Sequence, residues 1–421
     1  MQQNDIYDAA VIGGGLSGLT AAAALAHRGF SIVVADPAPK DALLSDAYDG
    51  RVTAIAYAGA RMYRRLGVWD DLEAHASPIN DILVTDGQRE TRFDKGRVSG
   101  FRLHFDRQET SDGAPLGWIV ENRHLRRALF KAAETSANIR LIFSAGRRAS
   151  RFLSDRAEAD LENGETLAAR LLVAADGRRS ALREEAGIKS IGWSYPQTGI
   201  VTTVAHEAPH KGVAQEYFLP SGPFAILPMA DETSGRATVH RSSLVWTERT
   251  RLASALLDLD AAAFNHQLKE RFGPYLGAVE AAGPRWSYPL SLHIAQSFIA
   301  PRLALVGDAA HGIHPIAGQG FNLGLKDIAA LTEVLGHARR VGLDIGHLSV
   351  LERYQRWRRF DTASLAFGTD ILNRLYSNDI APVRALRDVG MALTGKIAPL
   401  SRFFMRHAGA DIGDLPELMK A

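Results

Sequence analysis

Residues 7–36 read YDAAVIGGGLSGLTAAAALAHRGFSIVVAD, and this stretch decides the fold. The apolar runs at 7–12 and 31–35 predict two short buried strands, and the alanine-rich run at about 19–27 predicts a helix between them. A strand, a glycine turn, a helix and a second strand within about 30 residues form a βαβ unit. The chain is therefore expected to begin with a Rossmann-type α/β domain.

The glycines of the turn follow the spacing G-x-G-x-x-G. The first glycine permits the tight turn, the second lets backbone approach a pyrophosphate, and the third lets helix pack on strand. The free N–H groups of the helix start favour a phosphate there. A carboxylate after the second strand can bind ribose hydroxyls. The expected dinucleotide site is Gly13, Gly15, Leu16, Ser17, Gly18 and Asp36. This motif alone does not separate FAD from NAD.

The composition excludes several classes of protein. A chain of 421 residues is too long for one compact core, so two or three lobes are expected. The formal net charge of +2 argues against a nucleic-acid partner. The absence of cysteine excludes disulfides, iron–sulfur clusters and thiolate zinc sites. The N-terminus lacks the features of a signal peptide, which favours a cytoplasmic protein.

Two further strand ends carry acidic turns. An apolar strand at 171–175 ends in Asp176-Gly177, and another at 303–306 ends in Gly307-Asp308. Between them, from about 191 to 290, segments separated by Pro, Gly and His indicate a β-rich inserted lobe. The domains expected are a discontinuous cofactor domain (1–75, 100–190, 285–340), a substrate domain (76–99, 191–284) and a helical C-terminal region (341–421).

The stretch LALVGDAAH (303–311), followed by Pro315 and GQGFNLGL (318–325), resembles the second FAD fingerprint of the class A flavin monooxygenases. By that resemblance, Asp308 binds a ribityl hydroxyl, Asp176 serves both FAD and nicotinamide, and Arg51 reaches the flavin. A glycine-rich segment entering a helix near Phe321 also aims a positive dipole end at reduced flavin, which is an anion. The residues expected to contact FAD in this region are Gly307, Asp308, Gly318, Gly320, Phe321 and Asn322.

The resemblance extends over residues 5 to 419 or so, to the ubiquinone-biosynthesis hydroxylases of the UbiH/UbiF type. Eight segments carry it: DGRVTAI (49–55), LGVW (66–69), VENR (120–123), GWSY (192–195), FLPSGPFA (218–225), SLVWT (243–247), YSND (376–379) and RFFMRH (402–407). The VENR segment adds Asn122 and Arg123 to the expected cofactor contacts. The implied fold is that of para-hydroxybenzoate hydroxylase, with an inserted β-rich substrate domain.

The resemblance implies FAD-dependent hydroxylation of a polyprenylated phenol in ubiquinone biosynthesis, with O₂ as oxidant and NADH or NADPH as transient reductant. Pro315 is implied to lie beside the flavin, and His311 is expected as a hydrogen-bonded residue beneath it. No second G-x-G-x-x-G occurs, so the nicotinamide is expected to dock on the FAD domain. The pair His311 and His314 lacks an evident third ligand, and no metal is expected.

The catalytic base is not identified from the sequence. A phenol reacts faster when ionised, so a base or acceptor would help. Tyr195, Tyr217 and His206 are candidates, although a structural role is the favoured interpretation of each. Aromatic and apolar residues of the inserted lobe are expected either to line a substrate pocket or to form plain core. They are Phe218, Pro220, Pro223, Phe224 and Trp246.

The segment 384–406 contains five basic residues and one acidic residue among apolar ones, for a net charge of +4. Such a segment can lie on an anionic membrane or pack on a partner, so peripheral contact with the inner membrane and with other ubiquinone-biosynthesis proteins is considered. An ordinary helix that covers the FAD domain is the alternative. Alternatives of the same fold are a prenyl-chain reductase and a halogenase, although the Trp-x-Trp-x-Ile-Pro signature of halogenases is absent. A non-catalytic scaffold is the third alternative.

Overall fold

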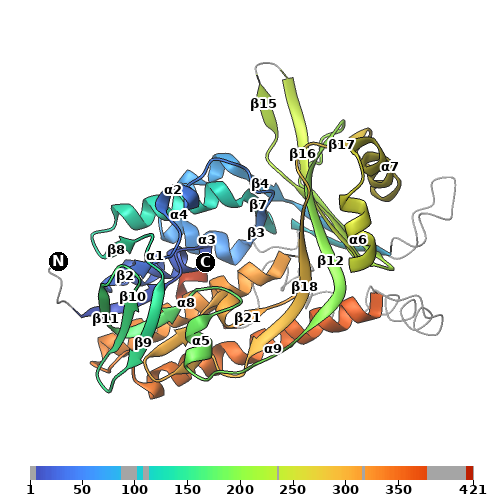
Figure 1. Cartoon of the computed structure of the whole chain (residues 1–421). Coiled ribbons are helices and arrows are strands. Elements are labelled where there is room, and N and C mark those ends of the chain that lie inside the picture. Colours follow the sequence, from blue (N-terminus) through green and yellow to red (C-terminus); the bar gives the residue numbers. More distant parts are fainter. Residues whose placement is uncertain are drawn as a thin grey trace.

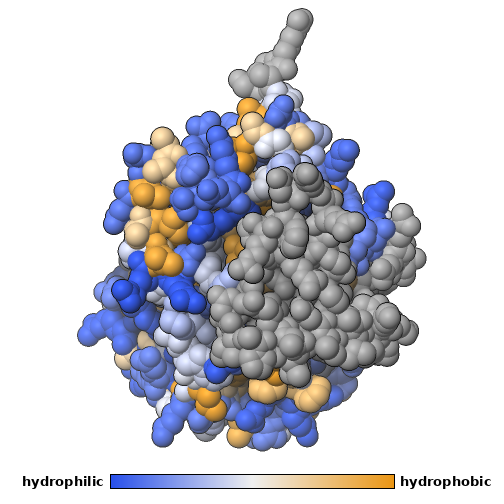
Figure 2. All heavy atoms as spheres, turned by 90° about the vertical axis from the view of Figure 1, so that its right-hand side faces the viewer, coloured by the Kyte–Doolittle hydropathy of each residue, from blue (hydrophilic) through white to orange (hydrophobic). Residues whose placement is uncertain are grey.

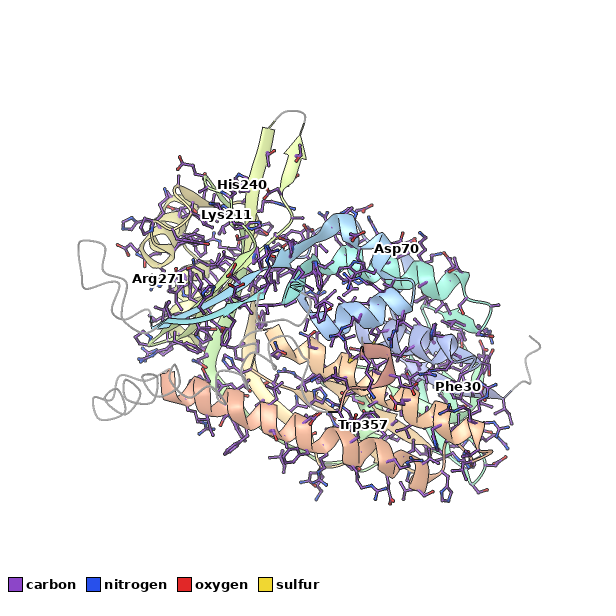
Figure 3. The ribbon with its side chains drawn as sticks, turned by 180° about the vertical axis from the view of Figure 1, so that it is seen from behind. Phe30, Asp70, Lys211, His240, Arg271 and Trp357 are labelled. Atoms are coloured by element: carbon purple, nitrogen blue, oxygen red, sulfur yellow. The ribbon has the colours of Figure 1, made fainter. Side chains whose placement is uncertain are left out.

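The computed structural model describes residues 6–86, 102–107, 113–234, 237–314, 318–376 and 414–420. These form two lobes, one built around a parallel sheet with helices and one around a long antiparallel sheet (Figure 1). Seen from behind, six labelled side chains mark them: Lys211, His240 and Arg271 on the antiparallel lobe, and Phe30, Asp70 and Trp357 on the other (Figure 3).

The parallel sheet confirms the predicted βαβ unit. Strand β1 (Tyr7–Ile12) lies at its centre, between β2 (Ile32–Ala35) and β11 (Thr166–Ala174), and pairs in parallel with both. Strands β8 (Ile139–Ile142) and β20 (Leu303–Leu305) extend it in parallel, giving the order β20-β11-β1-β2-β8. Antiparallel strands complete eight: β9 (Arg147–Phe152), β10 (Ala157–Leu161) and β19 (Ile299–Ala300).

Helix α1 (Leu16–His27) is buried along its length, since every residue from Gly18 to Ala26 is buried. It packs against β2 and against two longer helices, α4 (Asn122–Thr135) and α8 (Gln319–Arg340). Because α1 is surrounded by these elements, its side chains are apolar on all sides and not on one face only. Its alanines are small enough to let the neighbouring elements approach closely. The other helices of this lobe are α2 (Lys40–Leu43), α3 (Tyr57–Arg65), α5 (Ala181–Glu185) and α9 (Leu348–Tyr376).

The antiparallel lobe is a ten-stranded sheet whose main path is β21-β18-β12-β16-β14-β13-β5-β6, and it is antiparallel along this path except for the parallel pair β13 and β5. One face is covered by α6 (Thr250–Leu257) and α7 (Ala261–Phe272), through a core cluster that includes Phe224, Trp246 and Phe264. The strands are β5 (Asp81–Asp86), β6 (Arg102–Asp106), β12 (Ser190–His206), β13 (Val213–Leu219), β14 (Gly222–Pro228), β15 (Glu232–Ser234), β16 (Ala237–Arg249), β17 (Val279–Ala281), β18 (Trp286–Ala295) and β21 (His311–Gly312).

A three-stranded sheet lies between the two lobes in Figure 1. It has the order β3-β7-β4, with bounds β3 (Val52–Ala56), β7 (Gly117–Glu121) and β4 (Ala76–Ile79). The antiparallel sheet extends past the range expected for the substrate domain, because β6 and β18 also pair within it.

The end of the chain returns to the cofactor lobe. Residues Glu417–Met419 form a 3₁₀ turn, and Leu418 and Met419 are buried in the core of that lobe. The Trp357 indole nitrogen on α9 donates to the Asp414 carbonyl at 3.0 Å. The predicted helical C-terminal region is thus helical through α9, whereas residues 414–420 form a docked turn.

Among the helices of the described residues, none has the length and apolar character that a bilayer crossing requires. On the face shown in Figure 2, the coloured surface has small groups of hydrophobic side chains among hydrophilic ones.

Candidate active site

Four of the predicted cofactor segments follow four neighbouring parallel strands. Gly13 follows β1, Asp36 follows β2, Asp176 comes two residues after β11, and Gly307 comes two residues after β20. Since these strands are adjacent in the order β20-β11-β1-β2, their carboxyl ends lie in one row about 14 Å long, at about 4.8 Å per strand. Ligands of open α/β sheets bind at this edge.

The glycines of the first turn have distinct roles. A Cβ on Gly18 would lie 1.8 Å from the Gly13 carbonyl oxygen, and a Cβ on Gly13 would lie 2.4 Å from the Ala175 carbonyl oxygen. These two positions therefore require glycine for packing. A Cβ on Gly15, in contrast, would meet no atom within 4 Å, which leaves open space in front of the helix. This space permits a ligand to approach the backbone closely, as the predicted pyrophosphate contact requires.

The start of α1 is suited to an anion. The N-cap is Gly15, which supplies no capping side chain, and the first turn contains no acidic residue. The first N–H groups of a helix have no intrahelical acceptor and carry a partial positive charge. With Leu16 and Ser17 half-exposed at this point, the helix start matches the pyrophosphate site predicted from the sequence.

The Asp36 carboxylate is held by two backbone amides. Its Oδ2 accepts from the Gly14 N–H at 2.6 Å, and its Oδ1 accepts from the Ala38 N–H at 2.8 Å. An ionised carboxylate offers about four acceptor sites, so both oxygens retain capacity for ribose hydroxyls. The turn after β2 thus fixes the orientation of the carboxylate.

The Gly307-Asp308 turn lies where α1 and α8 meet. A Cβ on Gly307 would be 2.9 Å from the Ser17 hydroxyl, and a Cβ on Gly324 would be 3.1 Å from the Gly307 Cα. Gly307 adopts a φ of 57°, which also favours glycine. Asp308 is exposed, so its carboxylate is available at this junction and does not point into packed core. The position suits a ribityl chain running from the α1 turn toward α8.

The two carboxylate oxygens of Asp176 differ in their hydrogen bonding. Its Oδ2 accepts from the Leu182 N–H at 3.3 Å, whereas its Oδ1 is buried and has no hydrogen-bond partner among the described residues. A buried carboxylate oxygen without a donor is costly. Because Asp176 also neighbours Gly13 across the strand ends, the residues present fit a dinucleotide along this row.

A buried ionic cluster supports the 307–308 turn from behind. Asp327 on α8 accepts from His311 Nε2 at 2.5 Å, from Arg358 Nε at 2.9 Å and from the Gly307 N–H at 3.2 Å. His311, Asp327 and Arg358 are all nearly inaccessible to solvent, at 1%, 0% and 1% exposure. The expectation that His311 is hydrogen-bonded is confirmed. Its ring is buried and bonded to Asp327, and a catalytic role for it stays a prediction. Pro315 lies outside the described residues.

His314 is buried against the antiparallel sheet, with its ring 5.2 Å from that of Tyr195. The Tyr195 hydroxyl in turn donates to Asp370 on α9 at 2.7 Å. Burial lowers the pKa of His314 to about 4, and the Asp370 charge opposes this only partly. Between about pH 4 and pH 6.5, the His314 imidazole is therefore neutral in the folded protein, whereas it would be protonated in the unfolded chain.

This predicts an acid-sensitive contribution to stability. The folded-state pKa of His314 lies below its ordinary value of 6.5, so stability is lost as pH falls from about 6.5 toward about 4. Between pH 7 and pH 5 the loss from this group is about 2 kcal/mol. The free energy of unfolding is measured with urea at pH 7 and at pH 5 for both proteins. Its decrease between these pH values is expected to be about 2 kcal/mol smaller in His314→Asn than in the wild type. An equal loss in both proteins would contradict the assignment.

A cavity of about 280 Å³ lies between the cofactor lobe and the antiparallel sheet. On the cofactor side it is lined by β3 and by the start of α8, including Gly318 and Phe321. The lining residues are Arg51, Val52, Thr53, Ala54, Ile79, Ile82, Asn122, Val201, Ala214, Gln215, Glu216, Ala225, Leu227, Ser243, Val245, Tyr288, Gly318 and Phe321. The walls are mainly apolar with a few polar groups, as in small-molecule sites.

Of the predicted flavin-side residues Arg51, Asn122 and Arg123, two line the cavity and one does not. Arg51 and Asn122 line the cavity; Arg51 Nη2 pairs with Asp49 at 2.6 Å, and Asn122 accepts from Thr53 at 2.6 Å. Arg123 is absent from the lining, and its Nε donates to Glu121 at 2.7 Å.

The Asn322 side chain has partners on both sides of its amide. Its Nδ2 donates to the Ala54 carbonyl at 2.9 Å, and its Oδ1 accepts from the Ala56 N–H at 2.9 Å. These bonds tie the first turn of α8 to β3. Gly318, which begins α8 with a φ of 62°, would place a Cβ 3.1 Å from that of Ala54, whereas Gly320 has only a distant contact. Contact of Arg123, Asn322 and Gly320 with the cofactor stays a prediction.

The five residues proposed as pocket lining do not line this cavity. Phe224 and Trp246 are fully buried in the cluster beneath α6 and α7, on the opposite face of the sheet. Their neighbours Ala225 and Val245 face the cavity instead, because successive strand residues alternate sides. Phe218, Pro220 and Pro223 are likewise absent from the lining, and for Phe224 and Trp246 the interpretation as core is the correct one.

None of the base candidates from the sequence lines the cavity either. Tyr217 belongs to the cluster beneath α6 and α7, and both His206 ring nitrogens are bonded, to Ala208 O at 2.8 Å and Ser242 Oγ at 3.0 Å. Tyr195, as described, is engaged by Asp370.

Five polar cavity residues were missed: Thr53, Gln215, Glu216, Ser243 and Tyr288. The Tyr288 ring lies over Gly199, where a Cβ would be 3.0 Å from it. Although 36% of Tyr288 is accessible, surrounding atoms desolvate it and raise its pKa to about 12. The Ser243 hydroxyl is buried without a hydrogen-bond partner among the described residues. Strand alternation could have identified these residues only if the inward face had been known.

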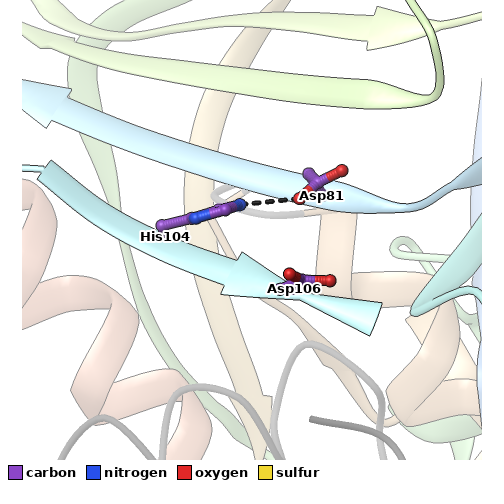
Figure 4. Close-up of side chains that lie close together, drawn as sticks. All are labelled: Asp81, His104 and Asp106. Carbon is purple, nitrogen blue, oxygen red and sulfur yellow. Dashed lines mark hydrogen bonds and ion pairs between the residues drawn. The ribbon is translucent and has the colours of Figure 1, made fainter. Parts of the chain in front are cut away.

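A cluster of possible metal ligands lies on β5 and β6, at one end of the antiparallel sheet. Ligand atoms of Asp81, His104 and Asp106 on β5 and β6 lie within 4.8 Å of one another (Figure 4). His104 Nε2 and Asp81 Oδ1 are 2.6 Å apart and form a hydrogen bond. This bond accounts for the approach of His104 and Asp81 without an ion.

Comparisons with known proteins agree with this geometry. A family model described as "FAD binding domain" matches residues 6–360. The ubiquinone hydroxylase UbiL of Rhodospirillum rubrum is 47% identical over 403 residues, which cover 96% of this chain and 89% of that protein. The 3-demethoxyubiquinol 3-hydroxylase of Escherichia coli is 32% identical, with coverage of 96% and 99%. The p-nitrophenol 4-monooxygenase PnpA of Pseudomonas putida shares the fold, with a TM-score of 0.73 at 20% identity, over 96% of this chain and 98% of that one.

Proposed function

Because this chain belongs to the family of FAD-dependent ubiquinone hydroxylases, we propose that it hydroxylates the aromatic ring of a polyprenylated phenol, with NADH or NADPH as reductant and O₂ as oxidant. One observation carries the proposal. The row of strand ends from Asp36 to Asp308 leads to the start of α8, and that helix start forms one wall of the cavity. A flavin held along the row would present its ring to a substrate in the cavity.

The residues along the row have separate tasks. The α1 start at Gly15 holds the pyrophosphate, Asp36 the ribose hydroxyls and Asp308 the ribityl chain. When bound, FAD supplies the electrons that activate O₂ for transfer of one oxygen atom to the ring. The start of α8 at Gly318 directs its positive end toward negative charge developing on the ring system.

The apolar walls of the cavity keep water away from the reacting atoms. Val201, Ala225, Leu227 and Val245 form the sheet side of this wall. Exclusion of water strengthens the electrostatic interactions inside and prevents loss of reactive oxygen as hydrogen peroxide. The nicotinamide is proposed to dock transiently on the FAD domain, near Asp176.

The test uses the purified full chain. Its visible spectrum reports bound flavin, and NAD(P)H and O₂ consumption are followed with and without a prenylated phenol, with product analysis for the added oxygen. We expect bound flavin, consumption of NAD(P)H and O₂ that depends on the phenol, and a hydroxylated product. Flavin without substrate-dependent O₂ uptake would favour the prenyl-chain reductase, and absence of flavin would favour the scaffold.

We also propose peripheral membrane contact through the basic segment 384–406, which lies outside the described residues. A prenylated substrate resides in the bilayer, so a membrane-bound enzyme would meet it there. Arg402→Glu with Arg406→Glu is expected to reduce co-sedimentation with anionic liposomes several-fold. Arg148→Glu with Arg251→Glu changes the net charge equally on exposed residues elsewhere and should have little effect. Unchanged co-sedimentation of the first variant would exclude this segment as the contact.

A further inference from the structure

A carboxylate lies within the apolar face of the antiparallel sheet. Glu216 is in the middle of β13 and is only 6% exposed. Its partners in the sheet register are Ala225 on β14 and Val84 on β5, and Ala225 pairs in turn with Val245 on β16. The neighbours of Glu216 across the strands are therefore apolar.

The sheet register directs the Glu216 side chain toward the cavity. Residues paired directly across strands share a face, and Ala225 and Val245 both line the cavity, as does Glu216 itself. The adjacent Gln215 also borders the cavity, but its side-chain oxygen accepts a hydrogen bond from the hydroxyl of Tyr217, which belongs to the cluster beneath α6 and α7. The carboxylate thus faces the same space as Gly318 and Phe321 on the cofactor side.

Glu216 is thus a carboxylate in a cavity wall whose other residues are mainly apolar. Among the residues lining the cavity, Arg51 and Tyr288 are the other two with titratable side chains. Arg51 is largely exposed and paired with Asp49, and the hydroxyl of Tyr288 is a weaker base than a carboxylate. Ionisable groups placed in this way concentrate at functional sites.

We infer that Glu216 is the catalytic base, which accepts the proton of the substrate's ring hydroxyl; this inference rests on the proposed function. As the O–H bond breaks, the proton passes to the carboxylate and the electron pair is delocalised into the ring. The ring carbon so enriched in electrons forms a bond to one oxygen atom of O₂ as the O–O bond breaks, and the other oxygen atom leaves as water with the two electrons that NAD(P)H supplies through FAD. That carbon then loses its hydrogen as a proton, which is used in forming the water, and the ring becomes aromatic again. The Glu216 carboxyl returns its proton to the original ring oxygen and is ionised once more.

The test is Glu216→Gln, which preserves the shape and removes the basic group. FAD content, and reduction of FAD by NAD(P)H without substrate, should stay within twofold of the wild type. The kcat for hydroxylation should fall about 100-fold, in the range for loss of a general base. The KM should change by only a few-fold. The wild-type rate should decline on the acid side as Glu216 becomes protonated, and this decline should be absent in the variant.

A matched control is Glu248→Gln. Glu248 is a buried glutamate of the same sheet, 3% exposed, two residues from Trp246 on the opposite face, and it does not line the cavity. It should show normal hydroxylation. A second measurement uses ring-fluorinated phenols, which ionise more readily. If Glu216 takes up the proton, the deficit of the Glu216→Gln variant should shrink with these substrates.

Wild-type hydroxylation together with full activity of Glu216→Gln would overturn the inference and leave the proposed function intact. A deficit that is the same at every pH and for every phenol would also overturn it, since it would indicate a structural role. Absence of hydroxylation in the wild type would instead refute the proposed function.

Discussion

Replacing Gly18 with alanine is expected to abolish retention of FAD and to destabilise the fold by about 3 kcal/mol, toward the upper end for overpacking. The added Cβ would lie 1.8 Å from the Gly13 carbonyl oxygen, and both groups belong to the backbone. Neither can rotate away, so α1 must move off β1. This movement would misplace the helix start that receives the pyrophosphate. The measurements are the ratio of flavin to protein after gel filtration and the urea unfolding of the apoprotein.

The control is a glycine-to-alanine substitution at a helical position where the added Cβ would meet no close atom. A Cβ on Gly336, within α8, would find Arg28 Cδ at 4.0 Å as its nearest contact. Gly336→Ala should therefore bind FAD normally and be stabilised by up to about 1 kcal/mol, the difference in helix propensity. Normal flavin content in Gly18→Ala would show that α1 is not the phosphate site.

Asp327→Asn is expected to lower the free energy of unfolding by about 3–5 kcal/mol, the range for breaking a buried ion pair. The substitution removes the buried counter-charge of the Arg358 guanidinium, leaves only the partly exposed Asp361 as its partner, and weakens the bond to His311. Asp327 also accepts a hydrogen bond from the Gly307 N–H, which helps to hold the 307–308 turn in place. The substitution should loosen this turn and thereby lower the affinity for FAD. Urea unfolding of the apoprotein and fluorescence titration with FAD measure the two effects separately.

The pH dependence of this cluster has a defined sign. Burial by itself would raise the pKa of Asp327, but the charges and hydrogen bonds of His311 and Arg358 outweigh burial and hold it below the usual 3.8. Its contribution to stability is therefore present above pH 3.8 and is lost as the pH falls through the lowered value. The deficit of Asp327→Asn should be largest near neutral pH.

Asp361→Asn is the matched control for the same arginine. Asp361 pairs with Arg358 Nη1 at 2.8 Å, but its side chain is 35% exposed. Solvent screening should limit the loss to below about 1 kcal/mol. Equal losses for Asp361→Asn and Asp327→Asn would contradict the view that the buried partner dominates.

Local motifs allowed much of the cofactor site to be predicted. The spacing of Gly13, Gly15 and Gly18 depends on contacts within one turn, and the strand ends at Asp176 and Gly307 follow short apolar runs. The pocket residues were harder to predict because a strand with apolar residues on both faces gives no sign of which face is inward. Phe224 and Trp246 were candidates for the pocket because they are aromatic, yet aromatic residues equally fill a core.

The sequence by itself determined the βαβ unit and the identity of the residues at each strand end, because these follow from hydrophobic periodicity and glycine sterics over a few residues. Only the tertiary structure decided that β20, β11, β1 and β2 lie side by side, that Asp327 joins His311 to Arg358, and that Glu216 faces the cavity. These relations depend on strand order, register and packing between segments far apart in the chain, for which no single segment carries a signal.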